Sequence, residues 1–184
     1  MSGIGPAPLA AGTVLPVGAV DTARAVGQPE PSSLPADVAS GGSGLPVTLR
    51  ITAGPRHDWF TDDSRAALTA QVWTVTAESN RIGLRLEPGA AETRPEPSPG
   101  VALQRSRTGE LPSEGVVAGS LQVPPSGLPV LFLADHPVTG GYPVIGAVVP
   151  EDLPAAAQLP PGTAVRFVEV DPETLQPAAP VSST

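Results

Sequence analysis

Hydrophobic and polar residues alternate along several short stretches of the chain. The alternation is clearest over residues 46–53 and 81–86, and in the second stretch Ile82, Leu84 and Leu86 are expected on one face. A period of two is typical of a half-buried strand. Short β-branched and apolar runs predict further strands over residues 72–76, 116–123, 128–134, 143–149 and 164–170.

Helical patterns are few and short. Thr61 precedes two aspartates, which predicts an N-cap and a helix that runs to about Ala70. Residues 151–158 favour a second short helix, interrupted by Pro154. Because roughly seven strands do not alternate with helices, the pattern favours a mainly β fold closed into a barrel, with one or two short helices.

Segments rich in Pro, Gly and Ser separate these elements. We expect residues 46–170 to form the compact barrel, and residues 21–45 and 88–108 to be a linker and a long loop with little order. Residues 1–20 contain enough apolar residues for one short strand, and residues 171–184 are expected to be a frayed tail.

The charge and composition exclude several classes of function. The 184 residues carry a net charge of −8 and include no lysine and no cysteine. Such a chain repels nucleic-acid phosphates and anionic membranes, and it cannot form disulfides or cysteine–metal sites. With no leader pattern and no apolar run of roughly 18 residues, a cytoplasmic protein is expected.

The stretch from residue 111 to residue 143 contains the strongest candidate site. Its two apolar runs flank the turn Pro124–Gly127, which predicts a hairpin whose open ends lie side by side. These ends carry two carboxylates, two hydroxyls and a glycine pair, and the glycines would let backbone N–H groups cup an anion. The residues are Glu114, Asp135, Thr139, Gly140, Gly141 and Tyr142.

Three motifs, in order, resemble one known family. They are GPR (54–56), ESNRIGLRL (78–86), and SEGVVAGSLQVPPSGLP (113–129) followed by DHPVTGGYP (135–143). The chain is similar here to the biotin-dependent carboxyltransferase family, also called allophanate hydrolase subunit 2 or the C-type subunit of 5-oxoprolinase. The resemblance implies a cyclophilin-like β-barrel. It also implies that the chain corresponds to the C-terminal half of the family domain, with residues 1–20 a remnant of the preceding half.

Nine residues are candidates for the site, and for Asn80 and Arg81 it is the resemblance that favours a function. Glu114 and Asp135 are the catalytic candidates, and the substrate-binding candidates are Asn80, Arg81, Gln122, Thr139, Gly140, Gly141 and Tyr142. Simpler interpretations stay open for several of them. Asn80 is also a common turn residue, Arg81 an ordinary exposed strand residue, and Glu114 a solvated loop acid. Gln122 either faces outward or turns its amide into a pocket.

Other chemistries have weaker support. Asp135 and His136 are neighbours that point to opposite sides of an extended segment, and His57 has no metal-ligand spacing to them, so no metal is expected. The sequence has no G-x-S-x-G elbow and no phosphate-binding loop with its lysine. We therefore expect no cofactor on this chain alone. ATP would be used by a complex, and biotin would arrive only on a partner.

The resemblance thus implies a component of an ATP-dependent 5-oxoprolinase or allophanate-hydrolase-type complex. Its implied partners are the B-type 5-oxoprolinase subunit (allophanate hydrolase subunit 1) and the A-type subunit, and its substrate is a small amide or lactam whose C–N bond is hydrolysed. The isolated chain is expected to be inactive. The alternative is a truncated, non-catalytic protein that binds and regulates a kinase-inhibitor-like subunit.

Overall fold

The computed structural model describes residues 9–16, 18, 28, 45–89 and 100–178, and the chain divides into two units, residues 1–31 and 32–184. In the first unit the described residues include a turn, in which the Thr13 backbone N–H donates to the carbonyl of Ala10 at 3.0 Å. The strand expected within residues 1–20 is absent from the described part of this unit, so that expectation is wrong there. Most of the expected linker 21–45 lies outside the described residues.

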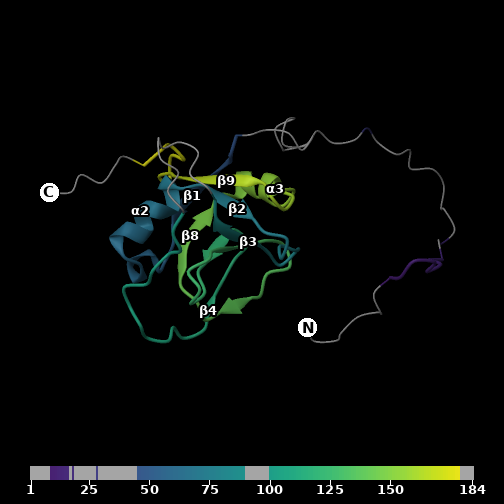
Figure 1. Cartoon of the computed structure of the whole chain (residues 1–184), viewed down its shortest axis with the longest axis horizontal. Helices are drawn as coiled ribbons and strands as arrows, with labels where there is room; N and C mark the ends of the chain where they lie inside the picture. Colours follow the sequence, from purple (N-terminus) through teal and green to yellow (C-terminus); the bar gives the residue numbers. More distant parts are fainter. Residues whose placement is uncertain (1–8, 17, 19–27, 29–44, 90–99, 179–184) are drawn as a thin grey trace. The chain divides into compact units, whose positions relative to one another are not determined.

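The second unit contains a closed barrel of seven strands, which confirms the predicted mainly β fold (Figure 1). In barrel order the strands are β1 (Val47–Ala53), β8 (Val144–Val148), β5 (Ser120–Gln122), β6 (Val130–Phe132), β3 (Gly83–Pro88), β2 (Trp73–Val75) and β9 (Ala164–Glu169). Neighbouring strands are antiparallel except β1 and β9, whose parallel ladder closes the barrel from Val47↔Val165 to Ile51↔Glu169.

Short helical segments flank the barrel. They are η1 (His57–Trp59), α2 (Asp62–Ala70), η2 (Pro150–Asp152) and α3 (Leu153–Ala156). Thr61 caps α2 as predicted, since its Oγ1 accepts a hydrogen bond from the Ser64 N–H at 3.2 Å. Pro154 does not interrupt a helix, because it lies in the first turn of α3, where a proline N–H would have no helical partner.

The main core is filled by aliphatic side chains and by three aromatic ones, Phe60, Trp73 and Phe167. Trp73 and Phe167 are almost fully buried, and the Trp73 indole Nε1–H donates to the Leu68 carbonyl at 3.0 Å, so its polar edge is satisfied. The alternation predicted for residues 81–86 holds for Leu84 and Leu86, which are buried. It fails at Ile82, which is 47% exposed because β3 begins only at Gly83.

Two further strands form an arm outside the barrel. β4 (Glu114–Gly115) pairs with β7 (Thr139–Gly140), in the register Glu114↔Gly140 and Gly115↔Thr139. These strands continue the two limbs of the β5–β6 hairpin, so the open ends of the predicted hairpin do lie side by side. In Figure 1 β4 lies at the lower edge of the barrel. We call residues 111–118 and 136–142 the arm.

The arm covers a second apolar cluster on the outer face of the barrel. Along β5 and β6, Leu121 and Leu131 point into the main core, whereas Phe132 and Val130 belong to an outer cluster with Val116 and Val144. Val116 comes from the arm, and its N–H donates to the Val138 carbonyl at 3.0 Å. The outer face of these strands is therefore also buried, as in a sheet packed on both sides.

The described part of the C-terminal segment is folded rather than frayed. Asp171 Oδ1 accepts hydrogen bonds from the backbone N–H groups of Glu173 and Thr174, and the Ala178 N–H returns to the Glu169 carbonyl at 3.0 Å. These hydrogen bonds lower the pKa of Asp171, those from Thr174 contributing most. The expectation of a frayed tail is thus wrong for residues 172–178.

One ion pair ties η2 and α3 to the barrel wall. Asp152 accepts from the Arg50 backbone N–H at 2.7 Å and from its guanidinium Nη2 at 2.7 Å. Burial raises the pKa of Asp152, but the hydrogen bonds from the Arg50 side chain and backbone outweigh it, and the pKa is lowered overall. A depressed carboxyl pKa contributes stability above the ordinary pKa, and this contribution is lost as the pH falls through the folded-state value.

Replacing Asp152 by Asn should therefore lower the free energy of unfolding at pH 7 by about 1–2 kcal/mol. The difference from the parent chain should shrink as the pH falls below the ordinary value of 3.8. Urea unfolding at pH 7 and pH 3 measures both quantities. Glu151→Gln, which changes the exposed neighbouring acid, is the control and should have little effect. A difference as large at pH 3 as at pH 7 would contradict this role of the ion pair.

Candidate functional site

The predicted site residues fall into two groups in the structure. Asn80, Arg81 and Asp135 lie together at one end of the barrel, and the other six candidates lie on the arm or directly beneath it. Among the described residues, no side-chain hydrogen bond or ion pair joins the two groups. That all of them form one pocket stays a prediction, and these contacts do not support it.

The first group is organised around an ion pair. Arg81 Nε lies 2.9 Å from Asp135 Oδ2 and its Nη2 donates to Asp135 Oδ1 at 3.2 Å, a two-pronged contact between planar groups. The Asp135 backbone N–H also donates to the Arg81 carbonyl at 3.0 Å, which fixes the two residues side by side. Arg81 is 82% exposed at its side chain and Asp135 48%. The pair therefore presents its outer edge to solvent.

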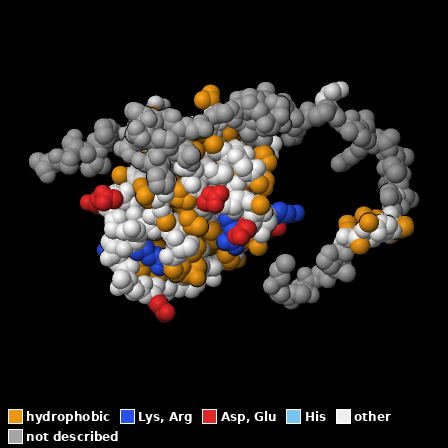
Figure 2. Space-filling view, in the orientation of Figure 1, with side chains coloured by type: hydrophobic (Ala, Val, Ile, Leu, Met, Phe, Trp, Pro, Cys, Tyr) orange, Lys and Arg blue, Asp and Glu red, His pale blue; other side chains and the backbone are white. Residues whose placement is uncertain are grey.

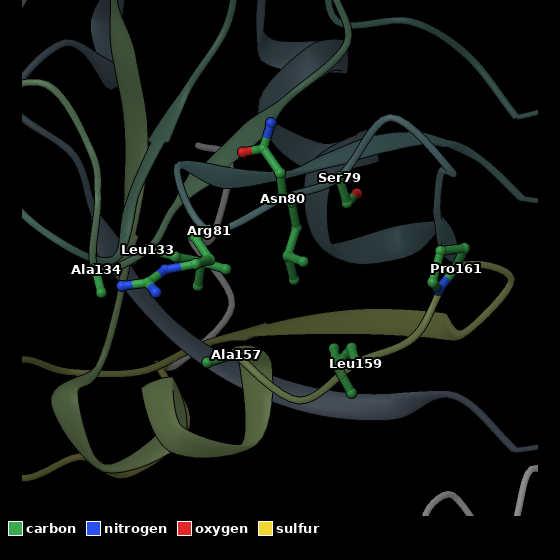
Figure 3. A pocket seen from close by; sticks show the side chains of 9 residues that line it. Ser79, Asn80, Arg81, Leu133, Ala134, Ala157, Leu159 and Pro161 are labelled. Carbon is green, nitrogen blue, oxygen red and sulfur yellow. The ribbon is translucent and has the colours of Figure 1, made fainter. Parts of the chain in front are cut away.

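Asn80 acts first as a turn residue, which is the simpler of its two interpretations. Its Oδ1 accepts from the Ile82 backbone N–H at 2.8 Å, an Asx-type turn that leads the chain into β3. The same turn directs Arg81 toward Ala134 (Figure 3).

A cavity of about 440 Å³ opens beside this group. Ser79, Asn80 and Arg81 form one side, while Ala157 at the end of α3 and the following turn form the other (Figure 3). The rest of the lining is apolar and includes three leucines of the main core, Leu84, Leu133 and Leu159. The cavity thus combines an apolar floor with polar groups at its mouth, the usual composition of a small-molecule site.

The second group is held to the barrel by Arg56. The Arg56 Nε donates to both carboxylate oxygens of Glu114 at 3.1 Å, and its Nη2 also contacts Glu114. Arg56 is positioned by the turn that Gly54 begins, because a Cβ at Gly54 would lie 2.4 Å from the Val144 carbonyl oxygen. The GPR motif therefore packs tightly against β8 and aims its arginine at the arm.

Glu114 is consequently a poor general base. The hydrogen bonds from Arg56 lower its pKa despite partial desolvation, so Glu114 stays ionised and binds protons weakly. Its contacts indicate that it positions the arm. A catalytic role for Glu114 stays a prediction. Arg56, which limits that role, was not among the predicted site residues, although it lies in the GPR motif that carries the resemblance.

Gln122 lies on the outer face of β5 and is nevertheless buried. It pairs in register with Val130 and Val144 of the outer apolar cluster and is only 6% exposed, because the arm covers it. Its Nε2 donates to the Tyr142 carbonyl at 3.0 Å. Gln122 therefore faces outward, the simpler of its two interpretations, but the arm buries it, which sequence alternation does not reveal.

The glycine pair does not form the anion cup that we expected. Neither Gly140 nor Gly141 has a positive φ, so the alternating right- and left-handed backbone of such a cup is missing. Gly140 instead makes room for Gln122, since a Cβ at residue 140 would lie 2.3 Å from the Gln122 Nε2. Thr139 pairs with Gly115 in the arm ladder, and Gly141 is exposed.

Tyr142 contacts an arginine that sequence analysis did not single out. The guanidinium carbon of Arg105 lies 5.7 Å from the centre of the Tyr142 ring, a cation–π contact. Arg105 Nη2 also donates to the Val123 carbonyl at 2.6 Å. The sequence pattern that could have indicated this arginine is Arg105-Ser106-Arg107, because residues two apart in an extended segment lie on the same face.

Other ligand classes have no structural support in the described part of the chain. No three His, Asp or Glu side chains there are grouped to hold a metal ion. Asp135 pairs with Arg81, whereas the ring of its neighbour His136 stacks on Phe132 with centroids 6.0 Å apart. None of the described helices is long and apolar enough to cross a membrane.

Comparison with known proteins gives matches along most of the chain. The family described as "Carboxyltransferase domain, subdomain A and B" matches residues 1–169. The 5-oxoprolinase C subunit of Escherichia coli (strain K12) is 33% identical over 121 residues, which is 66% of this chain and 35% of that protein. The 5-oxoprolinase C subunit of Haemophilus influenzae is 37% identical over 138 residues, which is 73% of this chain and 40% of that protein.

Solved structures show the same fold. The crystal structure of the K. lactis urea amidolyase matches with a TM-score of 0.54 at 24% identity, over 67% of this chain and 7% of that chain, a likeness in fold alone. The chain spans only 35–40% of the length of the two curated relatives described above.

The contact between Gly140 and Gln122 generates a stability prediction. Gly140→Ala should lower the free energy of unfolding by about 1–2 kcal/mol, because the new methyl group displaces a buried, hydrogen-bonded amide. Gly115→Ala, on the partner strand, is the matched control, since a Cβ there meets nothing within 4 Å. Urea unfolding of both variants provides the comparison.

A double-mutant cycle tests whether Gln122 causes the loss. In a Gln122→Ala background the cost of Gly140→Ala should largely disappear, because the obstructing amide is gone. An undiminished cost in that background, or equal effects at residues 140 and 115, would contradict the packing argument.

Proposed function

The chain belongs to the carboxyltransferase domain family, subdomains A and B, and on this basis we propose that it is one component of a 5-oxoprolinase-type complex that hydrolyses a small amide or lactam. Both curated relatives are named as a subunit of 5-oxoprolinase, which supports a place for this chain in such a complex. The chain spans 35–40% of their length. Subunits of the A and B types would supply the rest of the catalytic machinery. The ATP that drives the reaction would be held there, because this sequence contains no phosphate-binding loop.

The observation that carries this proposal is the Arg81–Asp135 pair, in which Arg81 lines a largely apolar cavity and Asp135 directly follows Ala134 of its lining. The amide of a lactam is held cis by its ring, so its N–H and C=O point to the same side. Such a group needs a hydrogen-bond acceptor and a donor next to each other. A carboxylate beside a guanidinium offers this combination, since Asp135 accepts from the N–H while Arg81 donates to the C=O.

Both partners have capacity for a ligand beyond the contact that they make with each other. A guanidinium has five N–H groups, and a carboxylate has two oxygens that each accept more than one hydrogen bond. A lactam at the exposed edge of the pair would place its ring carbons against Leu84, Leu133 and Leu159 in the cavity. The cavity volume of about 440 Å³ is ample for a five-membered ring with a substituent.

Arg81 would contribute to chemistry as well as to binding. Attack on an amide carbonyl moves negative charge onto its oxygen, and a fixed cationic donor at that oxygen stabilises the transition state more than the ground state. Asp135 would hold the N–H and keep the ring oriented. If the reaction used carboxybiotin instead, the biotin would come on another chain, since this sequence has no lysine to carry it.

A second candidate is a non-catalytic role in binding a partner and regulating a kinase-inhibitor-like subunit. The arm favours it, because Val117 and Val138 are 64% and 80% exposed there. Exposed aliphatic side chains on a projecting element suit a protein interface.

The test is Arg81→Gln in a complex reconstituted with A-type and B-type subunits. We expect kcat/KM for the lactam to fall by roughly 10²–10³-fold, as for a lost oxyanion donor. The melting temperature should stay unchanged, because the Arg81 side chain is mostly exposed. Arg85→Gln, an exposed arginine on β3, is the matched control and should retain activity.

Two outcomes would contradict the catalytic proposal. One is full activity of the Arg81→Gln complex, and the other is turnover by the isolated 184-residue chain without partners. The regulatory role would be favoured by two results together. The parent complex would not turn over the lactam, and Val117→Asp or Val138→Asp would prevent the chain from forming the complex.

A further inference from the structure

A second cavity, of about 630 Å³, lies between the extended segment 101–108 and the turn that joins β5 to β6. Its lining includes Arg105, Arg107 and Thr108 on one side and Pro124, Pro125 and Ser126 on the other. No carboxylate is among the described residues that line it, in a chain whose net charge is −8. We propose that this groove is a binding site for a small oxyanion, a carboxylate or a phosphate, held by Arg105 and Arg107. The proposal is independent of the lactam site.

Both arginines are held in place before any ligand arrives. Arg107 lies over the Trp59 ring at 5.8 Å from its centre and donates to Asp58 Oδ2 at 2.7 Å. Arg105 lies over the Tyr142 ring and donates to the Val123 carbonyl. Stacking on an aromatic face restricts a long side chain, so binding an anion would cost little further conformational entropy.

Arg105 is the stronger indication, because its charge is incompletely compensated. It is half-buried, its hydrogen-bond acceptor is a neutral carbonyl, and its buried Nε has no hydrogen-bond partner among the described residues. Arg50, Arg56 and Arg81 each pair with a carboxylate instead. A partly desolvated charge without a counter-charge is costly, and an anion in the groove would offset that cost.

The wall of the groove is rigid. The turn places Gly127 at φ +77°, and a Cβ there would lie 2.5 Å from the Leu103 carbonyl oxygen. The Leu103 N–H donates to the Gly127 carbonyl at 2.9 Å, and the Leu103 side chain is buried in the main core. The segment that carries the two arginines is thus anchored to the barrel, as a preformed site requires.

The chemistry of the groove favours an oxyanion over other ligands. Guanidinium groups bind carboxylate and phosphate oxygens through paired, charge-assisted hydrogen bonds. The hydroxyls of Thr108 and Ser126, which also line the groove, can donate to further anion oxygens. On the face shown in Figure 2 the charged side chains are scattered in small groups rather than gathered into one acidic patch, so a local positive site is compatible with the negative net charge.

The experiment is a calorimetric titration of the isolated chain with inorganic phosphate and, separately, with acetate, at low ionic strength. We expect saturable binding of at least one anion. Arg107→Gln and Arg105→Gln should each weaken it by roughly tenfold or more, as expected for the loss of a charge-assisted hydrogen bond. Arg105→Lys, which keeps the charge but loses the planar fork, should recover only part of the affinity.

Arg85→Gln removes one positive charge from an exposed site outside the groove and is the matched control. Binding of phosphate but not acetate assigns a phosphate ligand, and the reverse assigns a carboxylate. No saturable binding of either anion would overturn the proposal. An equal loss of affinity in Arg85→Gln would also overturn it, because binding would then reflect net charge alone. Melting curves of each variant verify that it is folded.

Discussion

Closure of the barrel through the parallel β1–β9 ladder holds the whole second unit together. Five residue pairs join two strands from opposite ends of the described barrel sequence, and no strand edge is left between them. Closure buries Leu49, Val165 and Phe167, and it brings the turn before β9 to the end of the barrel. That turn supplies Leu159 and Pro161 to the cavity beside Arg81. The proposed lactam site therefore exists only in the closed barrel.

The arm makes a second layer on one side of the same barrel. It covers an apolar outer cluster, and its polar contacts come from Arg56, Gln122 and Arg105, which reach Glu114 and Tyr142. Several residues of the separate sequence motifs thus contact each other here. Their contacts are mainly structural, since they fix the arm. The chemistry of the proposed function lies instead with the Arg81–Asp135 pair.

The arginines of this acidic chain have different roles according to their partners. Arg50 and Arg56 are bound to carboxylates and hold elements together. Arg81 also pairs with a carboxylate, but this pair is exposed, Arg81 lines a cavity, and the pair offers a donor beside an acceptor, which suits a neutral amide. Arg107 pairs with Asp58, but Arg105 beside it has only a neutral carbonyl acceptor, and no carboxylate is among the described residues that line their groove, which suits an anion. Arginine is thus proposed to bind a neutral amide at Arg81 and an anion at Arg105, and the difference is that Arg81 has a carboxylate partner whereas Arg105 has none among the described residues.

Local patterns in the sequence were enough to establish the main elements and the family. Alternation identified β1, an apolar run identified β9, and capping chemistry identified α2. Three motifs in order identified the carboxyltransferase resemblance. Each of these signals lies within a few residues of the chain, so it can be read without the tertiary structure. Which polar residues meet depends instead on how the barrel closes. Arg56 reaches Glu114 across 58 residues and Arg81 reaches Asp135 across 54, and neither separation is encoded by a local pattern. The burial of Gln122 likewise depends on the arm that covers it, since alternation along β5 reports only which side a residue faces.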